Sequence, residues 1–425
     1  MKFRKSVKVL LFGICTAIIL TSCGTGENTP SVVSTPSTES AVSQMESGES
    51  SAYIQESSET SVSIVPQEWQ DNGIFSAFYE DAYTLLESMS MEEKVGQMIF
   101  ASCPTDGTAV ELAQECHLGG YVLFWSNFED MTTDEVKSMI AEYKSALSVN
   151  LAIAVDEEGG TVVRVSSHEN LADEPFASPR EIYAAGGLEL LKTKETEKAV
   201  LLNSLGIDIN LAPVCDIATE EGDFMYDRSL GENADMTAEF VAQTVEVYQT
   251  NNVSATLKHF PGYGGNTDTH TGTATDTRPY SDFVAEDFKP FQSGIDSGAN
   301  FVMVSHNIVT SMDTENPSSL SAAVHRILRE DLCFTGLITT DDLSMGAIAD
   351  YEGDPFVAAV LAGNDIIMTG EPRAAFQSVL TAVEDGTIDK EWIDHAVFRI
   401  LAWKLSVGAL PQTPPKALPL ETASL

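Results

Sequence analysis

The sequence predicts an α/β fold, a (β/α)8 TIM-type barrel that forms a single globular domain after a disordered N-terminal linker. Short apolar runs rich in β-branched residues recur along the chain, and stretches with helical periodicity separate most of them. Near-continuous apolar strands are typical of a parallel sheet that is buried on both faces. Eight strand–helix units in about 340 residues fit one such barrel. The predicted strands lie near Gly96–Ser102, Tyr121–Trp125, Leu151–Val155, Ile207–Pro213, Ala255–His259, Phe301–His306, Leu337–Thr340 and Asp365–Met368.

Helical periodicity is clearest in three stretches between the strands, Thr133–Leu147, Leu188–Leu205 and Met236–Thr250. The same alternation of strand and helix also fits a doubly wound, two-domain binding protein, and the pattern alone leaves that alternative open. A (β/α)8 barrel predicts more specifically where the functional residues lie in the sequence. Its functional side chains should follow the carboxyl ends of several strands and share one mouth.

Residues 1–22 have the features of a signal peptide. A basic segment precedes an apolar core of about a dozen residues, which is too short to cross a membrane as a helix. The core ends in Leu20-Thr21-Ser22-Cys23, which resembles the lipobox of bacterial lipoproteins. That resemblance implies an acylated Cys23 as the lipid anchor, and a protein held at the outer face of the bacterial cell membrane. The alternative is a plain secretory signal with Cys23 as an incidental thiol.

Composition divides the rest of the chain into three parts. Residues 23–68 are rich in Ser, Thr and Glu and poor in large apolar side chains, which predicts a disordered, lipid-anchored linker. Residues 69–412 have the composition of a globular domain, and residues 413–425 form a C-terminal tail. The chain carries 64 acidic and 23 basic residues, a formal net charge of −41. This charge would repel phosphate backbones and anionic lipids, so we expect no nucleic-acid partner and membrane contact through the anchor only.

Polar residues interrupt the apolar runs where five of the predicted strands end. A polar group at one strand end is usually structural, but five in the same register favour a functional site at the barrel mouth. In strand order these residues are Asp156 after the third strand, Asp216 after the fourth, Lys258 and His259 at the fifth, His306 after the sixth, and Asp341 with Asp342 after the seventh.

The sequence does not require a metal ion or a cofactor. It has no His-x-His or CxxC pair, no GxSxG motif, and no phosphate-binding glycine loop followed by lysine. A site made of carboxylates and histidines remains, which suits acid–base and carboxylate-nucleophile chemistry. The cysteines of the domain fit either buried small residues or disulfide partners, and their spacing leaves both readings open. They are Cys103, Cys116, Cys215 and Cys333.

The loop after the fifth strand, residues 258–270, carries three glycines, a proline and an Asp-x-His pair made of Asp268 and His270. An aspartate two residues from a histidine can accept a hydrogen bond from one ring nitrogen and fix the tautomer. The other nitrogen can then transfer a proton near neutral pH. The alternative is a turn in which Asp268 caps backbone amides.

Two adjacent aspartates, Asp341 and Asp342, follow the seventh strand. Adjacent strand residues point to opposite faces, so only one of the two can face the barrel mouth. The other is expected to form local hydrogen bonds that support it. Strand geometry alone does not choose between them.

Six segments in one order resemble glycoside hydrolase family 3, specifically its single-barrel branch of bacterial β-N-acetylglucosaminidases (β-hexosaminidases). The resemblance extends over about residues 88–410. Each motif is modest alone, and the combination on one chain is specific. The segments are Met91–Met98, Asp156–Gly160 with Arg164, Asn210–Asp216, Asp227–Gly231, Lys258–Gly262 and Thr340–Met345.

The resemblance implies roles for particular residues. Asp341 matches the family's nucleophile, and the Asp-x-His pair matches that branch's acid/base dyad, in which His270 transfers the proton and Asp268 orients it. Asp156 is similar to the aspartate that binds sugar hydroxyls. Other basic positions match residues that line the sugar pocket, namely Arg164, Arg228, Lys258 and His259.

The sequence departs from the family pattern at two places. The loop from Lys258 to the dyad is one residue shorter than in the best-known members, and Tyr263 stands where they often have histidine. Thr339 stands where an apolar residue is usual before the nucleophile motif. The first departure bears on loop closure and on the preference for the leaving group, and neither removes a catalytic group.

The function implied is a retaining exo-β-N-acetylglucosaminidase that hydrolyses terminal N-acetyl-β-D-hexosamine from cell-wall-type or other glycans through a glycosyl-aspartate intermediate. The expected partner is therefore a small carbohydrate with a terminal N-acetylhexosamine. One alternative is a β-glucosidase or β-xylosidase of the same family. Those enzymes resemble this barrel but take an acid/base glutamate from a second domain, for which about twenty residues after the last predicted helix, Ile393–Leu405, leave no room. The other is a non-catalytic sugar-binding lipoprotein.

Overall fold

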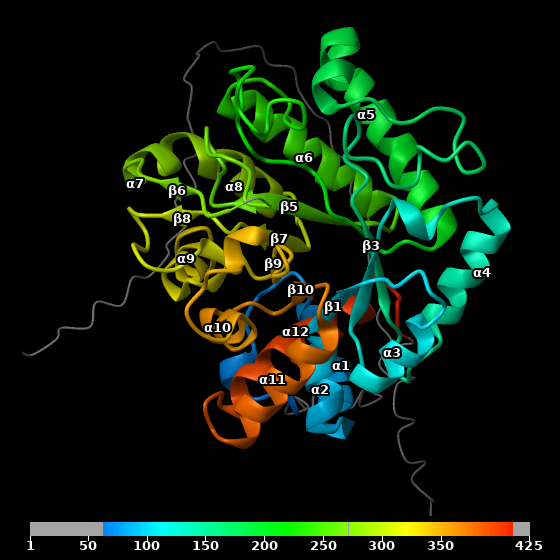
Figure 1. Cartoon of the computed structure of the whole chain (residues 1–425), viewed down its shortest axis with the longest axis vertical. Helices are drawn as coiled ribbons and strands as arrows, with labels where there is room; N and C mark the ends of the chain where they lie inside the picture. Colours follow the sequence, from blue (N-terminus) through cyan, green and yellow to red (C-terminus); the bar gives the residue numbers. More distant parts are fainter. Residues whose placement is uncertain (1–62, 271, 411–425) are drawn as a thin grey trace, which may run out of the picture. The chain divides into compact units, whose positions relative to one another are not determined.

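The computed structural model describes residues 63–270 and 272–410, and it confirms the predicted (β/α)8 barrel (Figure 1). Eight parallel strands form one sheet in the order β10-β1-β2-β3-β4-β5-β7-β9. A parallel bridge between Thr339 and Ile366 joins the two ends of this sheet, so the ring closes. The strands are β1 Ile99–Ser102, β2 Gly120–Leu123, β3 Ala152–Val155, β4 Ile209–Asn210, β5 Ser254–Phe260, β7 Phe301–Val304, β9 Leu337–Thr340 and β10 Ile367–Thr369, and a separate parallel pair is formed by β6 Thr275–Asp276 and β8 Ile308–Val309.

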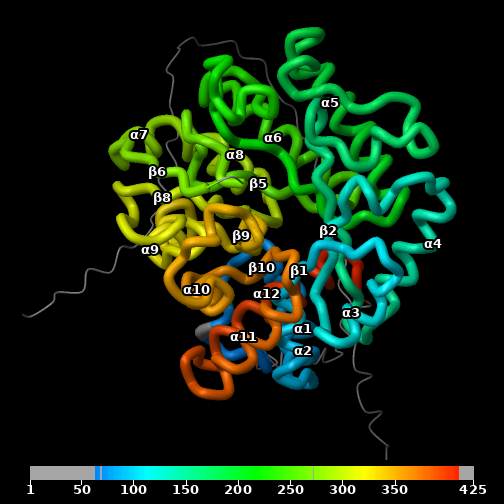
Figure 2. Tube along the Cα trace, viewed as in Figure 1, coloured from blue at the N-terminus to red at the C-terminus, as the bar shows by residue number. Residues whose placement is uncertain are grey.

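The helices surround the ring of strands, and the first and last helices of the domain lie side by side (Figure 2). An ion pair also links the amino-terminal part of the domain to its last helix, since Nζ of Lys94 on α2 lies 2.7 Å from the Asp394 carboxylate on α12. The helices are α1 Tyr79–Ser88, α2 Met91–Gln97, α3 Ala109–Cys116, α4 Thr133–Lys144, α5 Pro179–Leu205, α6 Ala234–Thr250, α7 Tyr280–Asp282, α8 Phe288–Asp296, α9 Ala322–Arg326, α10 Pro355–Ala362, α11 Pro372–Glu384 and α12 Lys390–Ser406.

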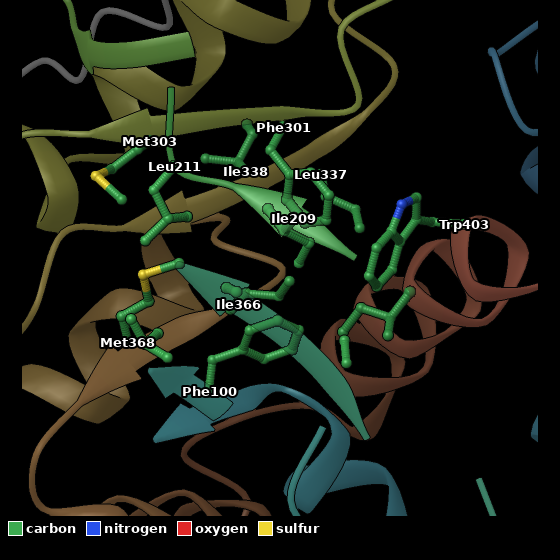
Figure 3. Close-up of a cluster of buried hydrophobic side chains, with 14 of the residues drawn as sticks. Phe100, Ile209, Leu211, Phe301, Met303, Leu337, Ile338, Ile366, Met368 and Trp403 are labelled. Atoms are coloured by element: carbon green, nitrogen blue, oxygen red, sulfur yellow. The ribbon is translucent and has the colours of Figure 1, made fainter. Parts of the chain in front are cut away.

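Buried apolar side chains from several strands pack against one another inside the ring (Figure 3). Phe100 of β1 and Ile209 of β4 belong to this cluster, and Trp403 of α12 completes it. The Trp403 indole packs edge-on against Phe301, with ring centroids 4.8 Å apart, and its N–H donates to the Ser254 hydroxyl at 2.9 Å. The last helix therefore supplies part of the core of the barrel.

Lys404 of α12 closes the amino-terminal end of the barrel. Its ammonium donates to the side chain of Gln97 at 2.7 Å and to the backbone carbonyls of Gly119 and Asn150 at 2.9 and 2.8 Å. These acceptors directly precede β1, β2 and β3. All three donors of the buried ammonium are thus satisfied, although burial lowers the pKa of Lys404 to about 7.

All eight predicted strands are present, and only two of them differ from the prediction by as much as three residues at one end. The strand predicted at Gly96–Ser102 starts at Ile99, because helix α2 runs to Gln97 and begins with a capping box between Ser90 and Glu93. The strand predicted at Ile207–Pro213 is reduced to Ile209–Asn210. The short β6–β8 pair has no counterpart in the prediction.

The helix predicted at Leu188–Leu205 is the second part of α5, which begins at Pro179. Ser178 and Glu181 form a capping box at its start, and Gly186 and Gly187 break the helical backbone inside it. The sequence therefore located the regular half of this helix and missed the first turns.

The predicted signal peptide, the lipid-anchor residue Cys23 and the tail 413–425 lie outside the described residues, so these remain predictions. The described part begins at Ser63, and Val65 is already buried against the domain. No helix between residues 63 and 410 is long and apolar enough to cross a membrane.

Candidate active site

A pocket of about 250 Å³ opens where the barrel strands end. Its apolar floor includes Leu211, Met303 and Met368, which belong to the cluster inside the barrel (Figure 3). The volume is close to the lower end of small-molecule sites, roughly 300 Å³. Seven of the eight residues predicted to bind or react with substrate line this pocket: Asp156, Arg164, Arg228, Lys258, His259, His270 and Asp341.

Asp341 directly follows β9 and is held by the backbone. Its N–H donates to the Val304 carbonyl at 3.0 Å, and its carboxylate accepts from the N–H of Asp342 at 2.8 Å. Burial alone would raise the pKa of Asp341, but the nearby imidazoles of His306 and His259, the Asp342 N–H and the Lys258 ammonium outweigh burial and lower it. The carboxylate is therefore ionised at neutral pH, as a nucleophile requires.

Asp342 also reaches the pocket, but its carboxylate is engaged locally. It accepts a hydrogen bond from the N–H of Ser344 at 2.8 Å. Its backbone carbonyl lies 3.0 Å from His306 Nε2, and the other ring nitrogen of His306 lies 2.8 Å from the Ser319 hydroxyl. The expectation that only one of the two aspartates faces the barrel mouth is therefore wrong, since both line the pocket, although Asp342 does form the expected local hydrogen bond.

The loop after β5 brings His270 to the same pocket, and Asp268 pairs with it. The carboxylate of Asp268 lies 2.6 Å from His270 Nδ1 and also accepts from the His270 backbone N–H at 2.9 Å. Because Asp268 occupies Nδ1, Nε2 is the nitrogen that can exchange a proton with a bound molecule. The imidazole is 60% exposed, so it can reach a ligand from the solvent side of the pocket.

Two basic residues and two carboxylates form a buried network in the wall of the pocket. Lys258 of β5 lies 2.7 Å from Asp156 and 2.5 Å from Glu158. Arg228 makes a bidentate contact with Glu158, at 2.9 and 2.7 Å. Burial would raise the pKa of Glu158, but Arg228 and Lys258 lower it strongly, so the Glu158 carboxylate is ionised at neutral pH.

His259 is fixed between an acid and a base. Its Nδ1 lies 2.7 Å from the Asp216 carboxylate, and its Nε2 lies 3.3 Å from the Arg228 guanidinium. Arg228 can only donate, so these partners fit an imidazole that donates from Nδ1 and accepts at Nε2. His259 and Arg228 therefore present fixed polar groups to the pocket, together with Asp156.

The prediction did not single out Glu157 and Glu158, which follow Asp156. Glu157 is fully buried, and its carboxylate accepts backbone N–H groups of Arg164 and Val165, both at 2.7 Å, so it shapes the loop that carries Arg164. Glu158 holds Arg228 and Lys258 in place. Three consecutive acidic residues at a buried strand end were the available signal, since a buried charge requires a partner.

No group of three or more histidine, cysteine or acidic side chains suited to a metal ion occurs among residues 63–270 and 272–410. The four cysteines of the domain are free thiols.

The fold and the site define a class of protein, a barrel enzyme whose pocket is lined by a strand-end carboxylate and by the histidine of an Asp–His pair. A family model described as "Glycosyl hydrolase family 3 N terminal domain" matches residues 90–403. The chain belongs to glycosyl hydrolase family 3, and it is a glycoside hydrolase.

Several known proteins are similar to this chain. A β-hexosaminidase of Xanthomonas campestris pv. campestris (strain B100) is 32% identical over 304 residues, which are 70% of this chain and 90% of the relative. The β-hexosaminidase LpqI of Mycobacterium tuberculosis is 29% identical over 329 residues, 74% and 83% of the two chains. A solved family 3 β-N-acetylglucosaminidase from Paenibacillus sp. str. FPU-7 has a TM-score of 0.71 and 31% identity, covering 79% of this chain and 66% of that one.

Proposed function

We propose that this glycoside hydrolase is a retaining exo-β-N-acetylglucosaminidase, with Asp341 as nucleophile and Asp268–His270 as the acid/base pair. One observation carries the proposal: an ionised strand-end carboxylate and the imidazole of an Asp–His pair line the same small pocket. The relatives described as β-hexosaminidases support the choice of sugar. The roles of the site residues come from this geometry together with the family pattern.

The proposed reaction is a double displacement. The Asp341 carboxylate bonds to the anomeric carbon while the glycosidic bond breaks, and His270 gives its Nε2 proton to the departing oxygen. The same nitrogen, now neutral, takes a proton from a water molecule that attacks the anomeric carbon and releases Asp341. Two inversions retain the anomeric configuration. Asp268 keeps the proton on Nδ1 throughout and stabilises the imidazolium state.

Sugar binding is assigned to the polar wall of the pocket. Asp156 and Lys258 hold each other at 2.7 Å and face the pocket together. Within the described residues, the Nε of Arg164 is buried without a hydrogen-bond partner, so it is available to a substrate oxygen. A buried donor without a partner costs about 1–3 kcal/mol, which an occupied pocket would recover.

A pair of substrates tests the choice of sugar. 4-Nitrophenyl β-glycosides with and without the 2-acetamido group should differ in kcat/KM by roughly a hundredfold or more in favour of the N-acetylglucosaminide, because a site built for a polar group discriminates strongly against its absence. Comparable rates on the glucoside or xyloside would contradict the hexosaminidase assignment and leave the glycosidase class intact.

A substitution tests the nucleophile. Asp341→Asn should lower kcat by roughly a thousandfold or more, because the amide cannot form the covalent intermediate. The variant should still bind N-acetylglucosamine. An active variant would remove Asp341 from this role, and a wild-type protein that binds the sugar without cleaving any glycoside would favour a sugar-binding lipoprotein.

We also propose that acylated Cys23 anchors the enzyme to the outer face of the bacterial membrane, since residues 20–23 resemble a lipobox. In cells that produce the full chain, Cys23→Ala should move the activity from the membrane fraction to the soluble one. Cys15→Ala, inside the same signal, is the matched control and should change nothing. Activity that stays soluble in the wild type would contradict the anchor.

A further inference from the structure

The loop that carries the acid/base pair is fastened by a buried hydrogen-bonded contact between Tyr263 and Thr269. The two hydroxyl oxygens lie 2.7 Å apart, and the backbone N–H of Thr269 donates to the Tyr263 hydroxyl at 2.9 Å. Both residues are only 1% exposed, although Thr269 stands between the more exposed Asp268 and His270. We call this contact the Tyr263–Thr269 clasp.

The clasp is connected to the nucleophile side of the pocket. The carbonyls of Thr269 and His270 accept hydrogen bonds from the N–H groups of Ala347 and Gly346, at 3.0 and 3.3 Å. Ala347 and Gly346 belong to the loop that follows Asp341. The backbone of the dyad segment, at Thr269 and His270, is thus held both by the Tyr263 hydroxyl and by the segment that follows Asp341.

The clasp is also connected to the sugar-binding wall. The N–H of Tyr263 donates to one oxygen of Asp216 at 2.7 Å, and the other oxygen lies 2.7 Å from His259 Nδ1. The Tyr263 ring packs at 5.6 Å from Phe224, whose ring lies 6.4 Å from the His270 imidazole. Tyr263 therefore contacts the binding wall through its backbone and the dyad segment through its hydroxyl.

We propose that Tyr263 is a positioning residue whose hydroxyl fixes Thr269 and thereby holds the Asp268–His270 pair over Asp341. This inference rests on the proposed function of the dyad and adds to it, since Tyr263 touches no reacting atom. The loop between Lys258 and His270 contains three glycines, and a backbone with that much conformational freedom needs such a fixed point. The proton is then delivered from a preset position rather than from a loop that must first be ordered.

Tyr263→Phe tests this proposal because it keeps the ring and removes only the hydroxyl. For an aglycone that needs protonation, such as a methyl or phenyl N-acetyl-β-glucosaminide, kcat/KM should fall about tenfold or more, with KM changed little. For the 2,4-dinitrophenyl glycoside, whose leaving group needs no proton, kcat/KM should change less than about threefold. Equal losses on both substrates, or no loss on either, would overturn the proposal.

Further variants separate positioning from simple loss of stability. Thr269→Val removes the partner hydroxyl and should reproduce the aglycone dependence, whereas Thr269→Ser keeps that hydroxyl and should restore near wild-type values. Tyr121→Phe is the matched control, because Tyr121 is also a buried tyrosine, and its hydroxyl donates to the Ala109 carbonyl at 2.6 Å away from the dyad. It should lose stability without any dependence on the aglycone.

The same series distinguishes failure of this inference from failure of the proposed function. His270→Ala should show the strongest dependence on the aglycone. If His270→Ala lacks that dependence, the dyad is not the acid/base pair and the proposed function is wrong in that respect. If His270→Ala shows it and Tyr263→Phe does not, only the role of Tyr263 is wrong.

Discussion

At the scale of single residues, the proposed proton transfer depends on how Asp268 holds the His270 ring, at 2.6 Å from Nδ1. Asp268→Asn keeps the shape but loses the charge that stabilises imidazolium, and it can impose the wrong tautomer. We expect kcat/KM on a methyl or phenyl glycoside to fall about a hundredfold, within the range for general acid catalysis. Steady-state kinetics measure this. Unchanged kinetics with an unchanged melting temperature would contradict the assigned role.

Glu158 controls a second property at this scale, the dependence of stability on pH. Its carboxylate is buried between Arg228 and Lys258, and its pKa lies well below the ordinary value of 4.5. A lowered acid pKa gives stability that is complete above pH 4.5 and is lost as the pH falls towards the folded-state pKa. Glu158→Gln should therefore cost about 3–5 kcal/mol at pH 7.

The difference between wild type and Glu158→Gln should then shrink at low pH. Below about pH 4.5 it should decrease by about 1.4 kcal/mol per pH unit, because the unfolded wild-type chain takes up a proton that the folded chain does not. Urea denaturation at several pH values measures the free energies of unfolding. A difference that stays constant from pH 7 to pH 3 would contradict this account.

At the scale of the elements, Gly96 sets how closely α2 approaches the end of α3. A Cβ at this position would lie 2.3 Å from the carbonyl oxygens of Cys116 and His117, which are backbone atoms and cannot turn aside. Gly96→Ala should therefore destabilise the domain by about 1–3 kcal/mol. Gly222→Ala is the control, since a Cβ there meets open space. Chemical denaturation compares the two, and equal effects would contradict the steric explanation.

The elements also show what the sequence could and could not predict. The strands were predictable because their apolar runs, such as Leu337–Thr340, reflect burial on both faces of a parallel sheet. The start of α5 at Pro179 had a local signal, the capping box of Ser178 and Glu181, which hydrophobic periodicity does not detect. The break inside the helix lies at two adjacent glycines, Gly186 and Gly187, which interrupt the periodic pattern between the first turns and the regular half.

The candidate site was likewise predictable from the sequence only in part. The side chains at strand ends were predictable, because a barrel places all those ends at one mouth. The network around Glu158 was not, because Arg228 and Lys258 lie far from it in sequence. The choice between Asp341 and Asp342 needed the family resemblance, because both carboxylates line the pocket and each accepts a hydrogen bond from a nearby backbone N–H.

At the scale of the whole molecule, the described domain holds together without disulfides. Cys103, Cys116 and Cys215 are buried, and burial raises the pKa of Cys103 to about 12 and that of Cys116 to about 11. Cys333 is exposed. In protein lacking residues 1–62, one thiol should therefore react with a thiol reagent in the folded state and four after unfolding. A reductant should leave the melting temperature unchanged, and a shift on reduction would contradict the free thiols.

The position of α12 has a consequence for how this protein is made. Trp403 and Lys404 fill and close the barrel from its amino-terminal end, and both belong to the last helix of the domain. A growing chain released from the ribosome in order has all eight barrel strands and every earlier helix available while the amino-terminal end of the barrel is still open. The interior of the barrel would stay exposed to water until the last turns of α12 emerge. A chain that terminates before residue 403 should therefore be incompletely folded and be recognised by proteases or chaperones.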